Sequence, residues 1–193
     1  MVTTIAKPIT VSEYLAQEET SQEKHEFIER EIVKVAGASA NHNRLAVNFS
    51  RLLPLEMNDQ SYEIFISDMR LSLPDSDNYF YPDVMVVKGV PCFTNEKETA
   101  VTNPCLIAEI LSASTEGFDK NQKFAFYRTI PELQEYILID QEDYRVELYR
   151  KVGNRQWLLT ELVSQEDVLI LESVKVEISL TDLYKRVKCT KLG

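Results

Sequence analysis

The sequence predicts a mixed α/β fold, in which helices pack against a sheet of parallel and antiparallel strands. Three extended runs, 62–73, 80–87 and 104–111, anchor this prediction, and the last two are almost continuously apolar, as expected of strands covered on both faces. A helical pattern over 115–129 and a strand pattern over 134–140 follow, and this strand–helix–strand unit favours a parallel pair. An antiparallel meander with a turn at Gly153-Asn154 is predicted from three shorter segments: 145–150, 156–163 and 174–178.

The remaining predicted elements are shorter. A helix starts at Thr10 or within the next two residues. Residues 25–35 alternate between apolar and polar side chains, which predicts two strands with a turn at 29–30. Asn41 is the expected N-cap of a helix with apolar residues at helical spacing, and a last short helix begins after Thr181.

Length and composition are those of one globular domain covering residues 1–193. The chain has 21 Lys and Arg against 31 Asp and Glu, which gives a net charge of -10. Such a charge repels DNA overall, so a nucleic-acid binder of this composition needs a local basic groove. A site rich in metal-binding carboxylates also makes a chain acidic, because the bound cation restores the local charge.

The cysteines and the apolar segments indicate a cytoplasmic protein with no membrane association. Cys92, Cys105 and Cys189 match no zinc or redox spacing, and reduced thiols are the expected state. The first ten residues lack a secretory signal, and no apolar stretch is long enough to cross a bilayer.

Glu109 is the most unusual residue of the predicted core. It lies inside an apolar strand, where an unpaired carboxylate is costly or has a shifted pKa. Strand alternation puts it on the face of Ile107 and Leu111, so a lysine or a divalent cation must meet it there. Asp83, which precedes the apolar run VMVV, converges with Glu109 if the two strands are neighbours. Two carboxylates with carbonyl groups and waters form an ordinary ligand shell for Mg²⁺.

Lys123 follows Asp119 by four residues in the helix predicted after the Glu109 strand. The two residues are explained by a surface ion pair worth about 0.3 kcal/mol. They are also explained by chemistry, because a lysine can position an attacking water or stabilise the charge of a phosphoryl-transfer transition state. Asp83 and Glu109 likewise have a purely structural explanation, as a strand-end carboxylate and a buried ion pair.

Long stretches of the chain resemble the Uma-type family of restriction-endonuclease-like proteins. The resemblance is carried by YPDVMVV, by residues 103–140 and by RVELYR. The motifs P-D, E-x-L-S, S-T, D-x-x-x-K and E-Y-x-x-x-D occur in order, and the resemblance extends from about Thr10 to the terminal helix. It implies the PD-(D/E)XK nuclease superfamily, whose core is a mixed sheet flanked by helices.

The resemblance also implies roles for individual residues. Asp83 matches the Asp of the P-D motif, and Glu109 matches the acidic residue of the second motif. The superfamily lysine ordinarily stands two residues later, where this chain has Leu111. The family moves this lysine to the next helix, which implies Lys123.

Three further residues match positions of the family. Glu26 resembles an N-terminal glutamate that lies near the metal in the superfamily. Without the resemblance, Glu26 is explained as a charged residue on a strand face. His42 matches a recurrent histidine, although alone it reads as a helix-start or core residue. Asp68 resembles another strand carboxylate. The chain departs from the family at Glu29-Arg30, where Asp-Gly is common, and at Ala113, where Pro is common.

These observations predict a Mg²⁺- or Mn²⁺-dependent endonuclease that acts on DNA. Asp83 and Glu109 are the expected metal ligands, with Glu26 assisting and Lys123 orienting the attacking water. Cutting of both strands calls for two active sites, which predicts a twofold homodimer. Two alternatives remain open: a catalytically silent binding or regulatory module with this fold, and a hydrolase of a small phosphorylated substrate. A basic groove beside the carboxylates favours the enzyme.

Overall fold

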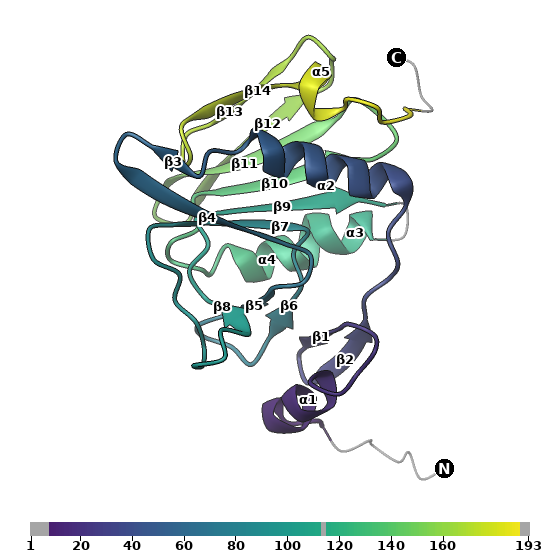
Figure 1. Cartoon of the computed structure of the whole chain (residues 1–193), viewed down its shortest axis with the longest axis vertical. Coiled ribbons are helices and arrows are strands. Elements are labelled where there is room, and N and C mark those ends of the chain that lie inside the picture. Colours follow the sequence, from purple (N-terminus) through teal and green to yellow (C-terminus); the bar gives the residue numbers. More distant parts are fainter. Residues whose placement is uncertain (1–7, 113–114, 190–193) are drawn as a thin grey trace.

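The computed structural model describes residues 8–112 and 115–189, and a seven-stranded sheet forms its centre (Figure 1). Within this sheet, β9 and β10 are parallel and the other neighbours are antiparallel. The strands lie side by side in the order β12 (Gln156–Leu162), β11 (Val146–Gly153), β10 (Glu135–Asp140), β9 (Leu106–Leu111), β7 (Val84–Lys88), β4 (Gln60–Ile66) and β3 (Glu56–Met57). The parallel pair and the β11–β12 hairpin confirm the predicted crossover and the start of the meander.

A second sheet of five short strands lies below the first in Figure 1, beside the helix α1 (Val11–Glu18). Its order is β2 (Glu31–Lys34), β1 (His25–Ile28), β6 (Tyr79–Phe80), β5 (Arg70–Ser72) and β8 (Ala100–Val101). A separate hairpin of β13 (Val168–Leu171) and β14 (Val176–Ser179) leads into α5 (Leu180–Leu183) at the other end.

Local chemistry explains where several elements begin. The side chain of Thr10 accepts a hydrogen bond from the backbone N–H of Glu13, and the Glu13 carboxylate accepts one from the backbone N–H of Thr10, which is a capping box. The β1–β2 turn at 29–30 is confirmed, because Glu29 and Arg30 both have positive φ angles, as its tight geometry requires. Helix α2 (Ala40–Leu52) is capped by Ser39, so the predicted cap at Asn41 was wrong.

Helices cover both faces of the seven-stranded sheet. On one face, Leu45 and Phe49 of α2 pack with Ala108 and Ile110 of β9. On the other face, α3 (Glu116–Phe118), the π-helical turn η1 (Asp119–Lys123) and α4 (Phe124–Tyr127) form one continuous helix, whose Tyr127 packs with Ile107 and Leu111. Strand alternation therefore turns Glu109 toward this second helix, as expected.

Three predicted strands differ from the structure. The run 62–73 is not one strand, because a positive φ at Ser67 breaks it into β4 and β5, which belong to different sheets. The run 80–87 is broken at Pro82, which has no N–H to donate to a sheet, so β6 and β7 also lie in different sheets. Residues 174–178 do not extend the meander; β14 pairs with β13 instead.

The structure also shows the state of the cysteines and the character of the helices. Cys92, Cys105 and Cys189 are all free thiols in the structure. Among residues 8–112 and 115–189, no helix has both the length and the apolar character needed to cross a bilayer.

Candidate functional site

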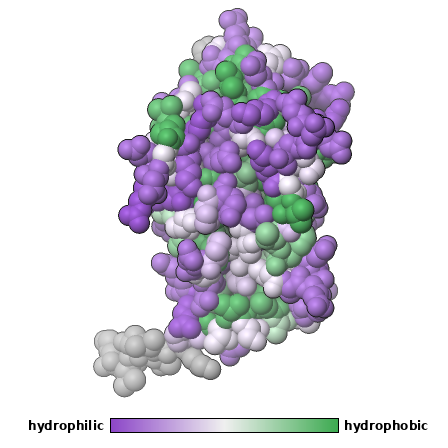
Figure 2. Space-filling model, turned by 90° about the vertical axis from the view of Figure 1, so that its left-hand side faces the viewer, coloured by the Kyte–Doolittle hydropathy of each residue, from purple (hydrophilic) through white to green (hydrophobic). Residues whose placement is uncertain are grey.

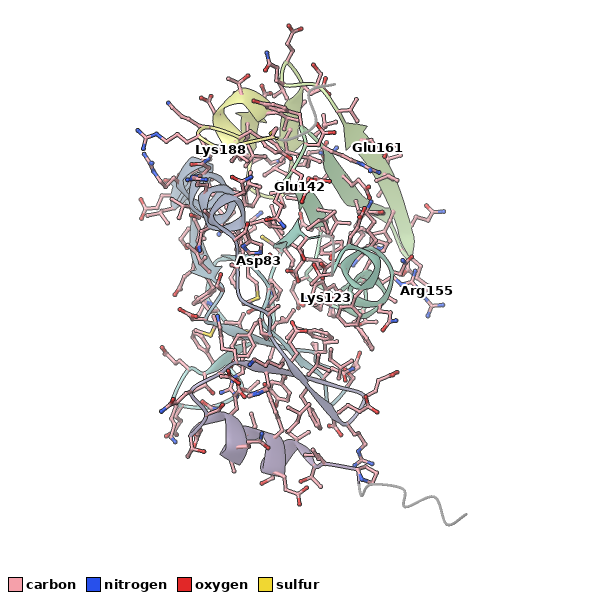
Figure 3. All side chains as sticks on the ribbon, turned by 90° about the vertical axis from the view of Figure 1, so that its right-hand side faces the viewer. Asp83, Lys123, Glu142, Arg155, Glu161 and Lys188 are labelled. Atoms are coloured by element: carbon pink, nitrogen blue, oxygen red, sulfur yellow. The ribbon has the colours of Figure 1, made fainter. Side chains whose placement is uncertain are left out.

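The candidate site lies where the chain passes from the small sheet into the large one. Asp83 stands in the link between β6 and β7, and Val84 pairs with Ala108, so Asp83 lies beside Glu109. Lys123 is the last residue of η1. Figure 3 looks along α2 and the second helix and shows Asp83 and Lys123 in the space between them.

Asp83 is held from three directions. Its backbone N–H donates to Oε2 of Glu109 at 3.3 Å. Its own Oδ2 accepts from the backbone N–H of Ile110 at 2.8 Å and lies 3.1 Å from Nε2 of His42. The carboxylate is therefore fixed against β9, while 17% of its side-chain surface remains exposed.

Lys123 is enclosed by three carboxylates. Its Nζ lies 3.1 Å from Oε1 of Glu109, 3.3 Å from Oε1 of Glu26 and 3.3 Å from Oδ1 of Asp119. The exposed side-chain fraction is 10% for Lys123 and 4% for Asp119, so the explanation of this pair as a surface ion pair was wrong. The residues from β9, β1 and the helix meet at one buried ammonium group.

Tyr127 completes the cluster, and the sequence argument did not identify it. Its hydroxyl donates to Oε1 of Glu109 at 2.8 Å. It stands four residues after Lys123, and residues at this spacing share a helix face, which is the signal that identifies it. Glu26 has a second anchor as well, because the backbone N–H of Tyr81 donates to its Oε1 at 3.2 Å.

Burial and charge act against each other on the two central groups. Burial raises the pKa of Glu109 well above its ordinary value; Lys123 opposes this rise, and Asp83 adds to it. Burial alone would lower the pKa of Lys123, but Glu109, Glu26 and Asp119 together raise it well above the ordinary value. The three carboxylates therefore favour the charged form of Lys123.

The carboxylates of Asp83 and Glu109 are the side chains of this site that would hold a divalent cation. Among the described residues, no group of three or more His, Cys, Asp or Glu side chains is placed to hold a metal ion. Asp83 and Glu109 still supply two adjacent carboxylates, and Oε1 of Glu109 is the oxygen that Lys123 and Tyr127 engage. Mg²⁺ is commonly held by one or two carboxylates, waters and substrate phosphate. Two adjacent carboxylates are therefore the type of donor that Mg²⁺ or Mn²⁺ takes, and the rest of a coordination shell would have to come from waters and substrate.

The two remaining candidates differ in their placement. His42 reaches the site through Asp83 from the first turn of α2. Asp68 does not reach it: its side chain is 89% exposed and pairs with Nζ of Lys24 at 2.9 Å on the surface. Of the seven residues that the sequence singled out, Asp68 alone lies outside this network of contacts.

Comparison with known proteins identifies the family. The Uma2 family model, described as "Putative restriction endonuclease", matches residues 11–182. Two proteins of Synechocystis sp. that carry the name "Uncharacterized protein" are similar along almost their whole lengths. The protein sll1609 is 61% identical over 91% of this chain and 99% of its own. The protein slr1290 is 32% identical over 92% of each chain.

A solved structure from Anabaena variabilis has the same fold. It is described as a "putative nuclease belonging to DUF820", and it superposes with a TM-score of 0.70 at 19% identity. The superposition covers 92% of this chain and 98% of that one, so the likeness extends over the whole fold. The family match over 11–182 and these relatives show that this chain belongs to the Uma2 family of restriction-endonuclease-like proteins.

Proposed function

We propose that this protein is a metal-dependent endonuclease that hydrolyses DNA phosphodiester bonds at Asp83, Glu109 and Lys123. The observation that carries the proposal is the contact of Lys123 with Glu109, beside Asp83, at the junction of three separate elements. Family membership supports the same class of reaction.

Asp83 and Glu109 would hold the cation. Bound Mg²⁺ or Mn²⁺ would polarise a phosphate oxygen and lower the pKa of an attacking water. Asp83 keeps its orientation through the N–H of Ile110 and through His42. Part of the Asp83 side chain is exposed, and substrate phosphate would approach from this side.

Lys123 would stabilise the negative charge that develops on the phosphate. Its raised pKa keeps the ammonium group charged, and its three carboxylate neighbours hold it in one place. A fixed charge stabilises a transition state without reorganisation during the reaction. The strand position two residues after Glu109 is occupied by Leu111, which is buried in the core, so the helix supplies the cation instead.

One observation favours a second candidate, a catalytically silent binding or regulatory module. Lys123 is already paired with three carboxylates, as a purely structural lysine would be. The net charge of -10 also fits poorly with a long DNA interface. A hydrolase of a small phosphorylated substrate is compatible with the same acidic surface.

The deciding experiment is cleavage of supercoiled plasmid and of single-stranded DNA in Mg²⁺, Mn²⁺ or EDTA. The variants are Asp83→Asn and Lys123→Met, with Asp68→Asn as the matched control because Asp68 is exposed and outside the site. We expect cleavage to need metal, to fall by about 100-fold or more in both site variants, and to persist in the control. Metal binding without cleavage of any substrate would favour the silent module.

Cleavage of both DNA strands would require a homodimer with two such sites. We expect linear plasmid to appear without a long-lived nicked intermediate, and sedimentation to give twice the mass of one chain. A monomer that only nicks DNA would remove the dimer from the proposal and leave the active site in it.

A further inference from the structure

A hollow of about 740 Å³ lies at the end of the large sheet remote from Asp83. Strand register fixes this position. Arg150 pairs with Glu135, and Glu135 pairs with Leu106 at the start of β9, whereas Asp83 lies near the opposite end of β9. The hollow is formed by the turn between β11 and β12 and by the segment that follows α4. Figure 3 shows Arg155 at the outer edge of the molecule, beyond the helix that carries Lys123.

The hollow is positively charged in an acidic protein. Arg128, Lys151 and Arg155 line it, and none of the described lining residues is an Asp or a Glu. Within the part of the chain that the structure describes, none of these three cations forms an ion pair, whereas Lys120 and Lys123 of the neighbouring helix are paired with carboxylates. Unpaired cations around a concave surface create a local positive potential that attracts anions.

An aromatic ring stands beside these charges. Trp157 is half-buried, and its ring meets that of Phe124 edge to face at 5.4 Å. The guanidinium group of Arg128 lies 5.9 Å from the centre of the same Phe124 ring. Phe124 thus holds an indole and a cation in fixed relation, which is the combination that binds a base by stacking and a phosphate by charge.

The remaining lining residues add polar contacts. The Thr129 hydroxyl donates to the carbonyl of Phe126 at 2.7 Å, so its oxygen can accept from a base edge, and the Asn154 amide can donate or accept. Nζ of Lys151 donates to the carbonyl of Pro131 at 3.0 Å, which positions its charge and leaves two further donors. Figure 2 looks onto this end of the sheet and shows a largely hydrophilic face with hydrophobic side chains in small separate groups. A charged ligand suits this face better than an apolar partner.

We propose that this hollow binds a nucleotide unit, with phosphate held by Arg128, Lys151 and Arg155 and the base placed against Trp157. The assignment of single-stranded DNA as the source of that unit rests on the proposed nuclease function. Arg128 directly follows α4, so a bound strand meets the end of the helix that carries Lys123. The hollow then supplies a local basic contact in a chain whose net charge is -10.

The test uses the intrinsic fluorescence of Trp157, which is the only tryptophan of the chain. The full-length protein is titrated in EDTA with an oligothymidylate of about ten nucleotides, with thymidine monophosphate and with inorganic phosphate. We expect saturable quenching by the oligonucleotide, with a Kd that rises steeply with salt because phosphate contacts release counterions. Weaker quenching by the mononucleotide is expected, and none by phosphate alone.

Variants test whether the hollow itself is the site. Arg128→Ala with Arg155→Ala is expected to raise the Kd at least tenfold, and both side chains are exposed, so the fold is retained. Lys88→Ala is the matched control, because this exposed lysine lies on β7, separated from β11 by β9 and β10. Trp157→Phe, followed by the anisotropy of a labelled oligonucleotide, is expected to weaken binding severalfold.

Each outcome bears on the proposal. Equal Kd values for mononucleotide and oligonucleotide support the nucleotide site and indicate that its ligand is the free mononucleotide. Absence of quenching by any probe, quenching by phosphate as strong as by nucleotide, or an unchanged Kd in the double arginine variant overturns it. The titration is made in EDTA, so it does not depend on the metal site. If the protein shows quenching but no nuclease activity, the proposed nuclease function is contradicted and the nucleotide site in the hollow is not. If the protein shows metal-dependent cleavage but no quenching, the nucleotide site in the hollow is contradicted and the proposed nuclease function is not.

Discussion

Nζ of Lys123 lies 3.1 Å from Oε1 of Glu109, although one residue comes from a helix and the other from the strand before it. The same oxygen of Glu109 also accepts the hydroxyl of Tyr127. One carboxylate oxygen is therefore held by two helical residues, and the other faces the backbone of Asp83. Glu109 therefore links the buried lysine to the backbone of Asp83, the other candidate metal ligand.

Replacing Lys123 by Met is expected to lower the free energy of unfolding by about 3–5 kcal/mol near pH 8, because Glu26, Glu109 and Asp119 lose their shared buried cation. In the variant, burial raises the pKa of Glu109 with no lysine to oppose it. A group with a raised pKa in the folded state stabilises below its unfolded pKa, and this contribution is lost as pH rises through the folded pKa. Urea unfolding should therefore show a smaller deficit near pH 5 than near pH 8.

The double variant Lys123→Met, Glu109→Gln is the control for this explanation. Removing the carboxylate along with the ammonium should restore part of the lost stability, so the two effects should not add. A deficit that is the same at both pH values, and additive in the double variant, would mean that packing alone accounts for the loss.

Tyr127→Phe removes one hydroxyl and leaves the ring. Burial first, and then Glu109, raise the pKa of this hydroxyl well above its ordinary value, so it remains a donor at neutral pH. We expect a loss of about 1–2 kcal/mol in stability. The reoriented Glu109 should also reduce the cleavage rate, by about 10-fold, with little change in KM.

The matched control is Tyr136→Phe, because the Tyr136 hydroxyl is also buried but donates to the backbone carbonyl of Asp119 at 3.0 Å. Tyr136→Phe should lower the free energy of unfolding by a similar amount and leave the cleavage rate almost unchanged. Equal kinetic losses in both variants would assign the Tyr127 effect to general loosening of the core.

Mn²⁺ should stabilise the wild-type chain in thermal unfolding, because the cation relieves repulsion between the adjacent carboxylates of Asp83 and Glu109. At a hundredfold excess over Kd the gain is about 2.7 kcal/mol. EDTA should reverse it, Asp83→Asn should abolish it and Asp68→Asn should retain it. This readout is independent of activity, so a stabilised but inactive protein would still locate the metal.

The apolar strands and their neighbours could be predicted from the sequence, because burial on both faces leaves a continuous hydrophobic signal. Runs such as 104–111 gave the parallel crossover, and the proximity of Asp83 to Glu109 followed from the pairing of their strands. The break at Ser67 could not be predicted, because a serine with positive φ gives no glycine-like signal. Ser39 and Asn41 are both good N-cap residues, so the sequence alone did not decide between them.

The environment of Lys123 was also undetermined by the sequence. The turn η1 is π-helical and spans Asp119–Lys123, so it holds one more residue per turn than an ideal helix and changes which side chains face the sheet. An ideal helix does not specify whether the Asp119–Lys123 pair is exposed or buried. Glu26 lies far away in the chain, and its contact with Lys123 depends on how the small sheet is placed against the large one.

The thiols should differ in reactivity. Burial raises the pKa of Cys105 to about 11, so this group stays protonated and shielded at pH 8. Cys92 is exposed, and Cys189 is intermediate with a pKa raised by burial and by Asp143. Iodoacetamide at pH 8, followed by peptide mass spectrometry, should modify Cys92 first, Cys189 more slowly and Cys105 only after unfolding. Early modification of Cys105 would show that this part of the core opens readily.

Glu135 should stabilise the fold without taking part in cleavage. Its fully buried carboxylate accepts from Nε of Arg150 at 3.0 Å and from the backbone N–H groups of Glu172 and Ser173 at 3.0 and 3.1 Å. It thus ties β10 to β11 and to the turn before β14. Glu135→Gln keeps the shape but removes the charge, and we expect a loss of about 3 kcal/mol in urea unfolding, with unchanged cleavage below the transition.

Glu172→Gln is the matched control for this prediction. Its side chain contacts the same arginine, at 3.1 Å from Nη1 of Arg150, but is 61% exposed. An exposed ion pair contributes less than about 1 kcal/mol, because water screens it. Both substitutions remove a carboxylate from Arg150, so the difference between their losses measures the effect of burial together with the backbone hydrogen bonds that Glu135 accepts. Equal losses would mean that Arg150 is anchored from the surface and that the buried carboxylate is dispensable.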